Sequence, residues 1–452
     1  MPAQITRAKG RDRSPGWIKQ TQEVASLRRR PFVFGAIVVF LGLYYYRPED
    51  FIQPLAYIPM AKVVGIIGFG ALIIGIMGGG KVQIPKAIKI LLLLLLHMTL
   101  CIPFALWKGG AFNTVWGKFS KGVVVAMLIS MAVVTLKEVR KLVWIQLSAV
   151  ALVTILSIAL HNYNPGGRLA GIQNSILSNP NDLAINIAIT FPLGLAFLLQ
   201  GRGFKRLLWV PALAFMCLGV VLTSSRSGLL ALIISVGICV WEYGIKGKRP
   251  RLVLVTVLAL VLGLGLAFSS AHYRARVESI VMGDIEGSGD KGSRAARLGL
   301  LKKSVVVALM HPIFGVGPGC FPLVDAQWVV AHNAYTELAA EAGLPALALF
   351  LMAMFAAFQN LAVVRKSQRY KEDAELRLLT QALWAGLVAY LAGSFFASTE
   401  YNMYPYFIIG YTSAFVKIVS VPFVPADNDK DQDPGLKSSA YPRARKPQML
   451  WS

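Results

Sequence analysis

The chain contains many apolar runs of membrane-spanning length, and these runs constrain its fold most. In hydrocarbon every backbone amide and carbonyl needs an internal partner, so each run forms a helix or joins a closed barrel. The runs lack the alternating pattern of barrel strands. We therefore expect an all-α polytopic membrane protein with about twelve transmembrane helices. The predicted spans are 32–46, 57–77, 87–106, 120–136, 142–160, 183–199, 207–222, 227–243, 252–270, 335–358, 378–397 and 404–421.

The composition agrees with a membrane protein. Of the 452 residues, 56% are hydrophobic and only 15% are charged, yet the formal net charge is +24. In a soluble protein such a charge would indicate nucleic acid binding. Here the lysines and arginines lie mostly in short loops and in the N-terminal tail, where positive charge sets the orientation of a membrane protein. We therefore expect membrane lipids, and no nucleic acid, as partners.

The distribution of these basic residues predicts which loops share a face of the membrane. With the N-terminus in the cytoplasm, the inner loops are richer in lysine and arginine than the outer ones, as orientation requires. The outer loop 107–119, which holds Lys108 and Lys118, is the exception. The pattern favours an even number of spans with both termini in the cytoplasm. The inner loops are 78–86, 137–141, 200–206, 244–251 and 359–377.

This assignment divides the chain into five segments. We expect a basic cytoplasmic tail, nine membrane helices, one large periplasmic loop between spans 9 and 10 that contains an amphipathic helix, three more membrane helices, and a charged tail rich in proline that is disordered. The segments are 1–31, 32–270, 271–334, 335–421 and 422–452.

Arg226 is the first candidate for a binding residue. It lies at a helix boundary predicted on the outer face, within the polar sequence Thr223-Ser-Ser-Arg-Ser-Gly228. An arginine at such a boundary often reaches lipid headgroups and does nothing more. The hydroxyl-rich surroundings favour a binding site instead, because an arginine that only anchors the chain to lipid headgroups needs no neighbouring serine or threonine residues.

Arg294 and Arg297 form a second basic group in the predicted outer loop. Being three residues apart, they share one face of a helix, and the apolar Leu298, Leu301 and Val305 continue that face. The pattern predicts an amphipathic helix along the membrane surface. Such a helix could bind only anionic headgroups. Alternatively, its guanidinium groups together with Arg226 could hold a lipid diphosphate, since arginine matches phosphate oxygens bidentately.

His332 is the candidate for acid–base chemistry. With an unperturbed pKa of about 6.5, a histidine can accept a proton from a hydroxyl group at neutral pH. The alternative is a polar residue at the start of a helix, where the neighbouring Asn333 could equally be the N-cap. Glu337 and Glu341 follow four residues apart near the same helix end, where acidic side chains also suit the helix dipole.

Two further acidic groups are candidates on the outer face. Asn181 and Asp182 open the span 183–199, where helix capping is the simpler role and support of a site the alternative. Glu49 and Asp50 lie in the first outer loop and could act as an alternative base. The sequence contains neither a phosphate-binding glycine loop nor a His-Glu-x-x-His motif. We therefore expect no metal ion and no cofactor.

These residues together resemble the O-antigen ligase and polymerase family of bacterial envelope glycosyltransferases. The family pattern is Arg-x3-Leu followed, after a long gap, by His-x10-Gly, and the second element fits His332 and Gly343. The first element fits from Arg294 or from Arg297, and its distance to the following turn favours Arg297. The sequences around Arg226 and around Asn181 also resemble family segments, so that the likeness covers about residues 165–400.

The resemblance implies a metal-independent, inverting glycosyltransferase in the bacterial inner membrane, with its active site on the periplasmic face. The donor would be a glycan on undecaprenyl diphosphate, and the acceptor a hydroxyl of the lipid A core. Arg226 and Arg297, assisted by Arg294, would neutralise the leaving diphosphate, and His332 would be the base. O-antigen polymerase or protein O-oligosaccharyltransferase activity is the alternative within the family. A transporter of polysaccharide or lipid is the alternative outside it.

Overall fold

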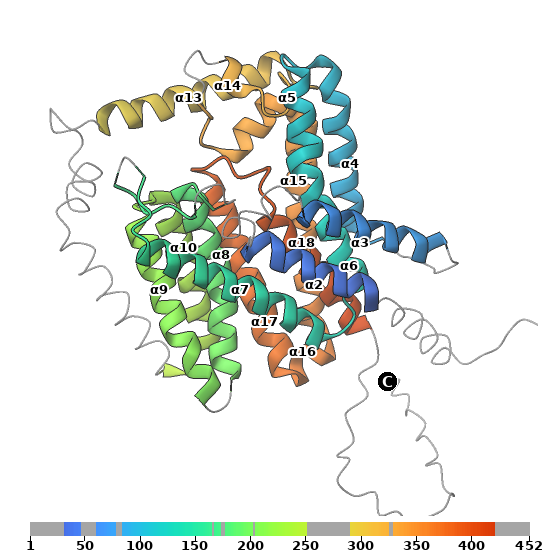
Figure 1. The fold of residues 1–452 in the computed structure, drawn as a ribbon, viewed down its shortest axis with the longest axis vertical. Coiled ribbons are helices and arrows are strands. Elements are labelled where there is room, and N and C mark those ends of the chain that lie inside the picture. Colours follow the sequence, from blue (N-terminus) through green and yellow to red (C-terminus); the bar gives the residue numbers. More distant parts are fainter. Residues whose placement is uncertain are drawn as a thin grey trace, which may run out of the picture. The chain divides into compact units, whose positions relative to one another are not determined.

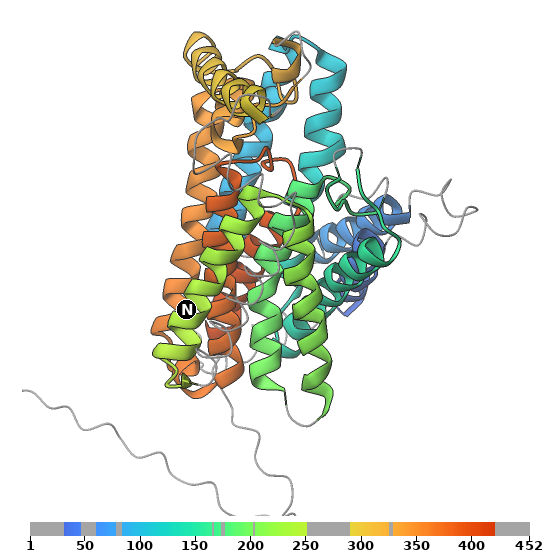
Figure 2. The ribbon, with the colours of Figure 1, turned by 90° about the vertical axis from the view of Figure 1, so that its left-hand side faces the viewer.

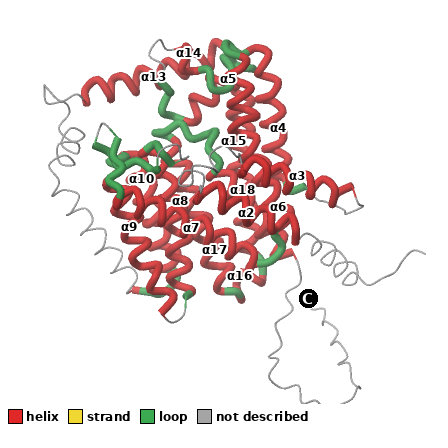
Figure 3. Tube along the Cα trace, in the orientation of Figure 1, coloured by secondary structure: helices red, strands yellow, loops and turns green. Residues whose placement is uncertain are grey.

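The computed structural model describes a helical protein. Within the described residues there is no strand, and the nearest approach to one is an isolated bridge between Tyr163 and Leu169. Figure 3 shows helices joined by short loops. The all-α prediction is therefore confirmed for this part of the chain. The described residues are 31–46, 60–77, 84–164, 167–172, 177–201, 204–250, 290–324 and 329–420.

Most predicted spans coincide with a helix. The exception is 252–270, which lies outside the described residues. In the part of the chain that the structure describes, seven helical segments are long and apolar enough to cross a membrane, and three apolar helices are shorter. The chain thus has the helices of a multi-pass membrane protein, while the number of twelve spans stays a prediction. These seven segments contain α4 (Lys86–Cys101), α6 (Ser120–Ala132), α7 (Leu136–Ala159), α8 (Pro180–Gln200), α10 (Arg226–Cys239), α15 (Ala334–Lys366) and α17 (Ala374–Ser394), and α4, α6 and α10 reach spanning length together with adjoining helical turns. The other helices include α2 (Pro31–Tyr46), α3 (Met60–Met77), α9 (Trp209–Leu222) and α18 (Tyr404–Ser420).

Three segments expected as loops from their charge are in fact largely helical, namely 107–119, 137–141 and 359–377. The last of these falls on the end of α15, on α16 (Gln368–Glu372) and on the start of α17. The segment 107–119 forms α5 (Lys108–Phe112) and a π-helical stretch, η4 (Asn113–Phe119), that continue into α6. The basic segment 137–141 is the first turn of α7. There Thr135 and Glu138 form a capping box, which satisfies the free amides of the helix start. Charge marks membrane orientation, but helix capping decides where a helix begins.

Two groups of helices pack around the site described below. Helices α8, α10 and α17 pack against one another, and α15 packs against α4, α13 (Asp290–Met310) and α18. Gly228 permits the close approach of α10 to α8, because a Cβ atom there would lie 2.1 Å from the Cβ atom of Ala184. Figures 1 and 2 show α13 running across the end of α15 instead of parallel to it.

The predicted amphipathic helix is α13, but it uses a different face than expected. Its buried residues Leu300, Ser304 and Val307 pack toward α15, and Ser304 donates a hydrogen bond to Thr336 there at 2.8 Å. Leu298 and Val305, predicted as its apolar face, are 51% and 41% exposed. The helix therefore has apolar side chains on more than the packed face, which suits contact with lipid.

Helix α15 is interrupted at Gly343, where φ is +80° and ψ is 171°. The loop after α13 docks onto this interruption: the N–H of Leu344 donates to the carbonyl of Pro312, and those of Val316 and Gly317 donate to carbonyls of α15. A backbone loop can approach this closely because glycine has no side chain. The docking fixes the start of α15 relative to α13, and both carry candidate site residues.

Candidate functional site

His332 lies immediately before α15, and its backbone is held by a neighbouring loop. Its φ is +56°, a left-handed conformation that non-glycine residues adopt only when the surroundings impose it. The N–H of His332 donates to Ser398 Oγ at 3.1 Å. Ser398 donates in turn to Glu337 Oε2, which also accepts from the N–H of Ala331 at 2.9 Å. Glu337 therefore helps to fix the backbone that presents the imidazole.

Asn333 caps the helix. Its Oδ1 atom accepts from the N–H groups of Tyr335 and Thr336 at 3.0 Å, and its Nδ2 atom donates to the carbonyl of Phe395 at 3.0 Å. The alternative role considered for His332, a polar residue that caps the helix start, is thus taken by Asn333. Among the described residues the imidazole of His332 has no hydrogen-bond partner. It remains available to a substrate.

The surroundings of His332 keep its imidazole neutral. Burial, and then the positive charges of Arg297 and Arg168, lower its pKa from 6.5 to about 4. At neutral pH the ring therefore carries one proton and one free lone pair, which is the state a general base needs. The charge of Arg297 thus acts on the imidazole of His332.

This pKa predicts how stability depends on pH. Between pH 6.5 and about 4 the unfolded chain protonates His332 and the folded protein does not, so stability falls as the pH falls through this window. We expect the thermal unfolding midpoint in detergent to drop between pH 7 and pH 5, and to drop less in the His332→Asn variant. Equal drops in the two proteins would contradict the lowered pKa.

Arg168 is a basic residue of the site that the sequence analysis missed. Its Nε atom donates to the carbonyl of Thr223 at 2.9 Å, and its Nη2 atom donates to Asn181 Oδ1 at 2.7 Å. Ser225 donates to the same oxygen at 2.8 Å. In the sequence Arg168 lies between the predicted spans 142–160 and 183–199, but only the fold shows that it joins the starts of α8 and α10 and that its charge reaches His332.

Arg226 is the first residue of α10 and is exposed. Ser225 is the N-cap of this helix and accepts a hydrogen bond from the N–H of Gly228 at 3.2 Å. The free amides and dipole of this helix end favour an anion beside Arg226. Two of the polar residues around Arg226 therefore have structural roles. Ser225 caps the helix, and the carbonyl of Thr223 accepts a hydrogen bond from Arg168.

Asn181 and Asp182 lie in the first turn of α8 but do not cap it. The N-cap is Asn179, whose side chain accepts from the N–H of Asn181 at 2.8 Å. The side chain of Asn181 holds Arg168, and Asp182 Oδ1 accepts from Asn402 Nδ2 at 3.0 Å. The capping role expected of the pair was wrong, because the preceding Asn179 takes it and leaves both side chains for contacts between distant loops.

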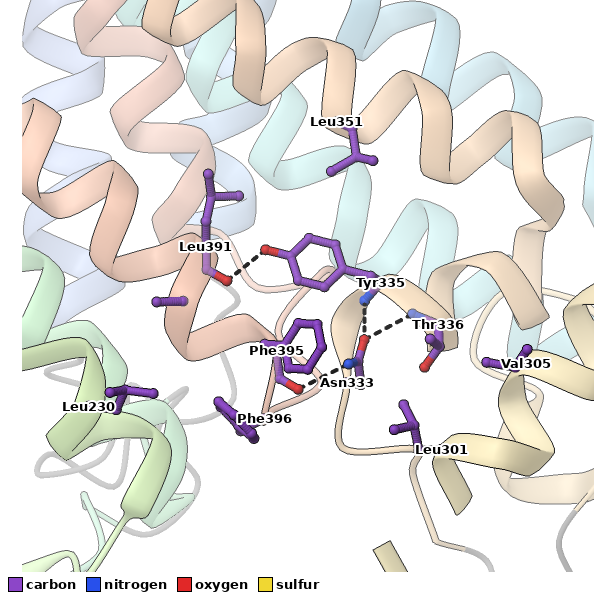
Figure 4. A pocket seen from close by; sticks show the side chains of 11 residues that line it. Leu230, Leu301, Val305, Asn333, Tyr335, Thr336, Leu351, Leu391, Phe395 and Phe396 are labelled. Carbon is purple, nitrogen blue, oxygen red and sulfur yellow. Dashed lines mark hydrogen bonds between the residues drawn. The ribbon is translucent and has the colours of Figure 1, made fainter. Parts of the chain in front are cut away.

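An apolar cavity of about 710 Å³ opens beside the start of α15. Asn333 and Thr336 are the polar side chains in its lining apart from the Tyr335 hydroxyl, which donates to the carbonyl of Leu391 at 2.7 Å. Figure 4 shows aliphatic and aromatic side chains from α10, α13, α15 and α17 around it. The lining residues are Leu230, Leu301, Val305, Asn333, Tyr335, Thr336, Leu351, Leu391, Ala392, Phe395 and Phe396.

The candidate arginines lie one helical turn from this cavity. Arg226 precedes the lining residue Leu230 by four positions on α10, and Arg297 precedes Leu301 by four positions on α13. Residues four apart share a helix face. His332 is next in the chain to Asn333, which also lines the cavity. An apolar cavity is thus associated with two cations and one neutral imidazole, an arrangement suited to an amphiphile that has an anionic head.

Glu337 and Glu341 are buried, and this goes beyond the helix-start role expected of them. Glu341 accepts from the N–H groups of Gly319 and Phe321 at 2.7 and 2.9 Å, and from the Tyr401 hydroxyl at 2.6 Å. It therefore anchors the glycine-rich loop that follows α13, which contains Gly315, Gly317 and Gly319, onto α15. Sequence periodicity placed both glutamates on one helix face, but it could not show that the glycine-rich loop would cover that face.

Three sequence candidates are not fully described. Arg294 lies in α13, one turn before Arg297. Glu49 and Asp50, the alternative base, lie outside the described residues. These three stay predictions.

Comparison with known families supports the resemblance. Residues 211–351 match the family model described as O-antigen ligase. This range contains Arg226, Arg294, Arg297, His332 and Gly343. The resemblance seen in the sequence is therefore confirmed over this part of the chain. No curated protein matched the chain.

Proposed function

Because residues 211–351 match the O-antigen ligase family, we propose that this membrane protein is a glycosyltransferase that moves a glycan from undecaprenyl diphosphate to a hydroxyl of the lipid A core. The observation that carries the proposal is a neutral His332, which is next in the chain to the cavity-lining residue Asn333. Arg226 and Arg297 lie one helical turn from other residues that line the same apolar cavity. A lipid-linked diphosphate has the two parts that this arrangement suits, namely a hydrocarbon chain and a compact anion.

The proposed location is the periplasmic face of the bacterial inner membrane. Arg226 begins α10, whereas the basic segment 244–251 follows the other end of the same helical segment. Since basic loops mark the cytoplasmic side, Arg226 falls on the opposite, periplasmic side. His332 and Arg297 belong to the same site and fall on that side with it.

The proposed reaction is a direct displacement. The acceptor hydroxyl oxygen forms a bond to the anomeric carbon while His332 takes its proton. The bond from the anomeric carbon to the phosphate oxygen breaks, and the undecaprenyl diphosphate leaves with the electron pair. Attack from the side opposite the leaving group inverts the anomeric centre.

The arginines act on the leaving group. Arg226 and Arg297, assisted by Arg294, stabilise the charge that develops on the diphosphate, as fixed cations in a site of low polarity can do strongly. Arg297 has a second effect, because its charge also lowers the pKa of His332. The proposal places no metal ion at the reacting atoms.

The test is a transfer assay with the purified full-length protein in detergent. A diphosphate-linked glycan donor is supplied with or without lipid A core, and the products are separated on a gel. Transfer that requires the core supports a ligase. A ladder formed from donor alone would make the protein a polymerase, and transfer to a protein acceptor an oligosaccharyltransferase. If no acceptor yields a product, the enzymatic proposal fails and a transport assay becomes the next experiment.

We expect the Arg226→Gln variant to lose about 10²-fold in kcat/KM, because one fixed cation at the leaving diphosphate is removed. The Arg226→Lys variant should keep part of the activity, since lysine preserves the charge but not the bidentate geometry. Arg249→Gln is the matched control, because Arg249 is an exposed arginine beyond the other end of the same helical segment. Equal activity of Arg226→Gln and Arg249→Gln would rule out the proposed role.

A further inference from the structure

Three buried glutamates lie close together near the start of α15, the helix that follows His332. One carboxylate oxygen of each of Glu337, Glu341 and Glu400 lies within 4.8 Å of the others. Their exposed fractions are 3%, 0% and 2%. Glu337 and Glu341 come from the start of α15, and Glu400 comes from the loop between α17 and α18. Three acidic side chains from two distant segments are thus brought together away from solvent.

The cluster has coordination capacity that the protein does not use. Glu400 Oε2 is buried and has no hydrogen-bond partner. The hydrogen bonds that Glu337 accepts both end on its Oε2 atom. A buried acceptor without a partner is costly, and a buried carboxylate without one is more so. Glu400 therefore indicates a partner that the protein itself does not supply.

Charge points to the nature of this partner. Within the described residues no lysine or arginine forms an ion pair with these three glutamates. The charge of Lys118 acts on Glu341 from farther away. With all three carboxylates ionised, the distant and exposed Lys118 would leave negative charges uncompensated in a buried place. One divalent cation would balance them, and carboxylate oxygens are the ligands that hard divalent cations prefer.

We propose that Glu337, Glu341 and Glu400 bind a calcium ion. Calcium lies about 2.3–2.6 Å from its oxygen ligands, so two ligands on opposite sides are about 4.6–5.2 Å apart. The spacing of up to 4.8 Å fits this geometry. For magnesium, with ligands at about 2.0–2.1 Å, opposite oxygens are about 4.0–4.2 Å apart. Separations up to the bound of 4.8 Å fit around calcium without movement of the side chains, whereas any separation above about 4.2 Å would have to shorten to bind magnesium.

The ion has a structural role. It ties the start of α15 to the loop between α17 and α18, and through Glu341 to the glycine-rich loop. Glu337 is also bound to Ser398, which holds the backbone of His332. The binding site does not depend on the proposed function. Only its consequence for the presentation of His332 rests on that function.

The experiment measures calcium directly. The full-length protein is purified in detergent, equilibrated with radioactive calcium and washed, and its unfolding midpoint is recorded in calcium, magnesium and chelator. We expect a single retained calcium ion per chain and a higher midpoint in calcium than in magnesium or chelator. The Glu400→Gln variant should bind calcium at least about tenfold more weakly. Glu372→Gln, which neutralises an exposed glutamate, should bind like the wild type.

The result that would overturn the proposal is clear from the wild type alone. If no calcium is retained and the midpoint is the same in calcium and in chelator, protons neutralise the cluster. Burial, followed by the charges of Glu337 and Glu341, raises the pKa of Glu400 well above its usual range, so that Glu400 would then hold a proton. Neither readout uses a glycan donor, so failure here is distinct from failure of the proposed transfer reaction. If Glu400→Gln does not fold, the wild-type measurements still decide.

Discussion

Replacement of His332 by asparagine is expected to lower kcat/KM for glycan transfer by about 10²–10⁴-fold, because the acceptor hydroxyl loses its general base. Asparagine is the informative replacement. It tolerates the left-handed backbone conformation that His332 adopts at φ +56°, whereas alanine would add strain. The assay is the same gel-based transfer reaction, with initial rates measured at several acceptor concentrations.

The control for this variant is His311→Asn. His311 is exposed in the turn after α13, and its backbone alone takes part in the hydrogen bonds of that turn. We expect it to transfer at the wild-type rate. The unfolding midpoint of His332→Asn at pH 7 is measured alongside, to separate chemistry from folding. A folded His332→Asn protein with wild-type activity would remove His332 from the mechanism and bring forward the alternative base, Glu49 or Asp50.

Replacement of Gly343 by alanine is expected to cost at least about 3 kcal/mol in the free energy of unfolding, by two effects. Its φ of +80° is a conformation that residues with a side chain rarely adopt. Its new Cβ atom would also lie 2.1 Å from the carbonyl oxygen of Ile313, which belongs to the backbone and cannot rotate away. The measurement is the unfolding midpoint in detergent, which should fall by several degrees.

Gly299→Ala is the matched control for this effect. Gly299 lies within α13, and a Cβ atom there would meet no other atom within 4 Å. Alanine has the higher helix propensity, so this variant should be as stable as the wild type or slightly more stable. Similar midpoints for Gly343→Ala and Gly299→Ala would show that α15 does not need the interruption at Gly343. Transfer activity of Gly343→Ala should also fall, because the displaced loop carries the amides that Glu341 binds.

The amino-acid sequence by itself determined the helical class and most helix positions. Apolar runs in a membrane have one way to satisfy their backbone, so their pattern translates directly into helices. It also placed Arg226 and His332 at helix boundaries and Arg297 within a helix, and it offered Asn333 as the cap that the structure shows. Local chemistry decides these features. The predicted span 252–270 and the tails lie outside the described residues and stay predictions.

Only the tertiary structure decided which distant residues meet. Arg168 acts on His332, and Glu400 joins Glu337 and Glu341, although each pair is separated by dozens of residues or more. Neither Arg168 nor Glu400 belongs to a motif, and each reads in the sequence as an ordinary polar loop residue. Their surroundings depend on how α8, α15 and the loop after α17 pack, which is set by side-chain fit and loop docking rather than by periodicity. The charge of a site, unlike the helices that carry it, is a property of that packing.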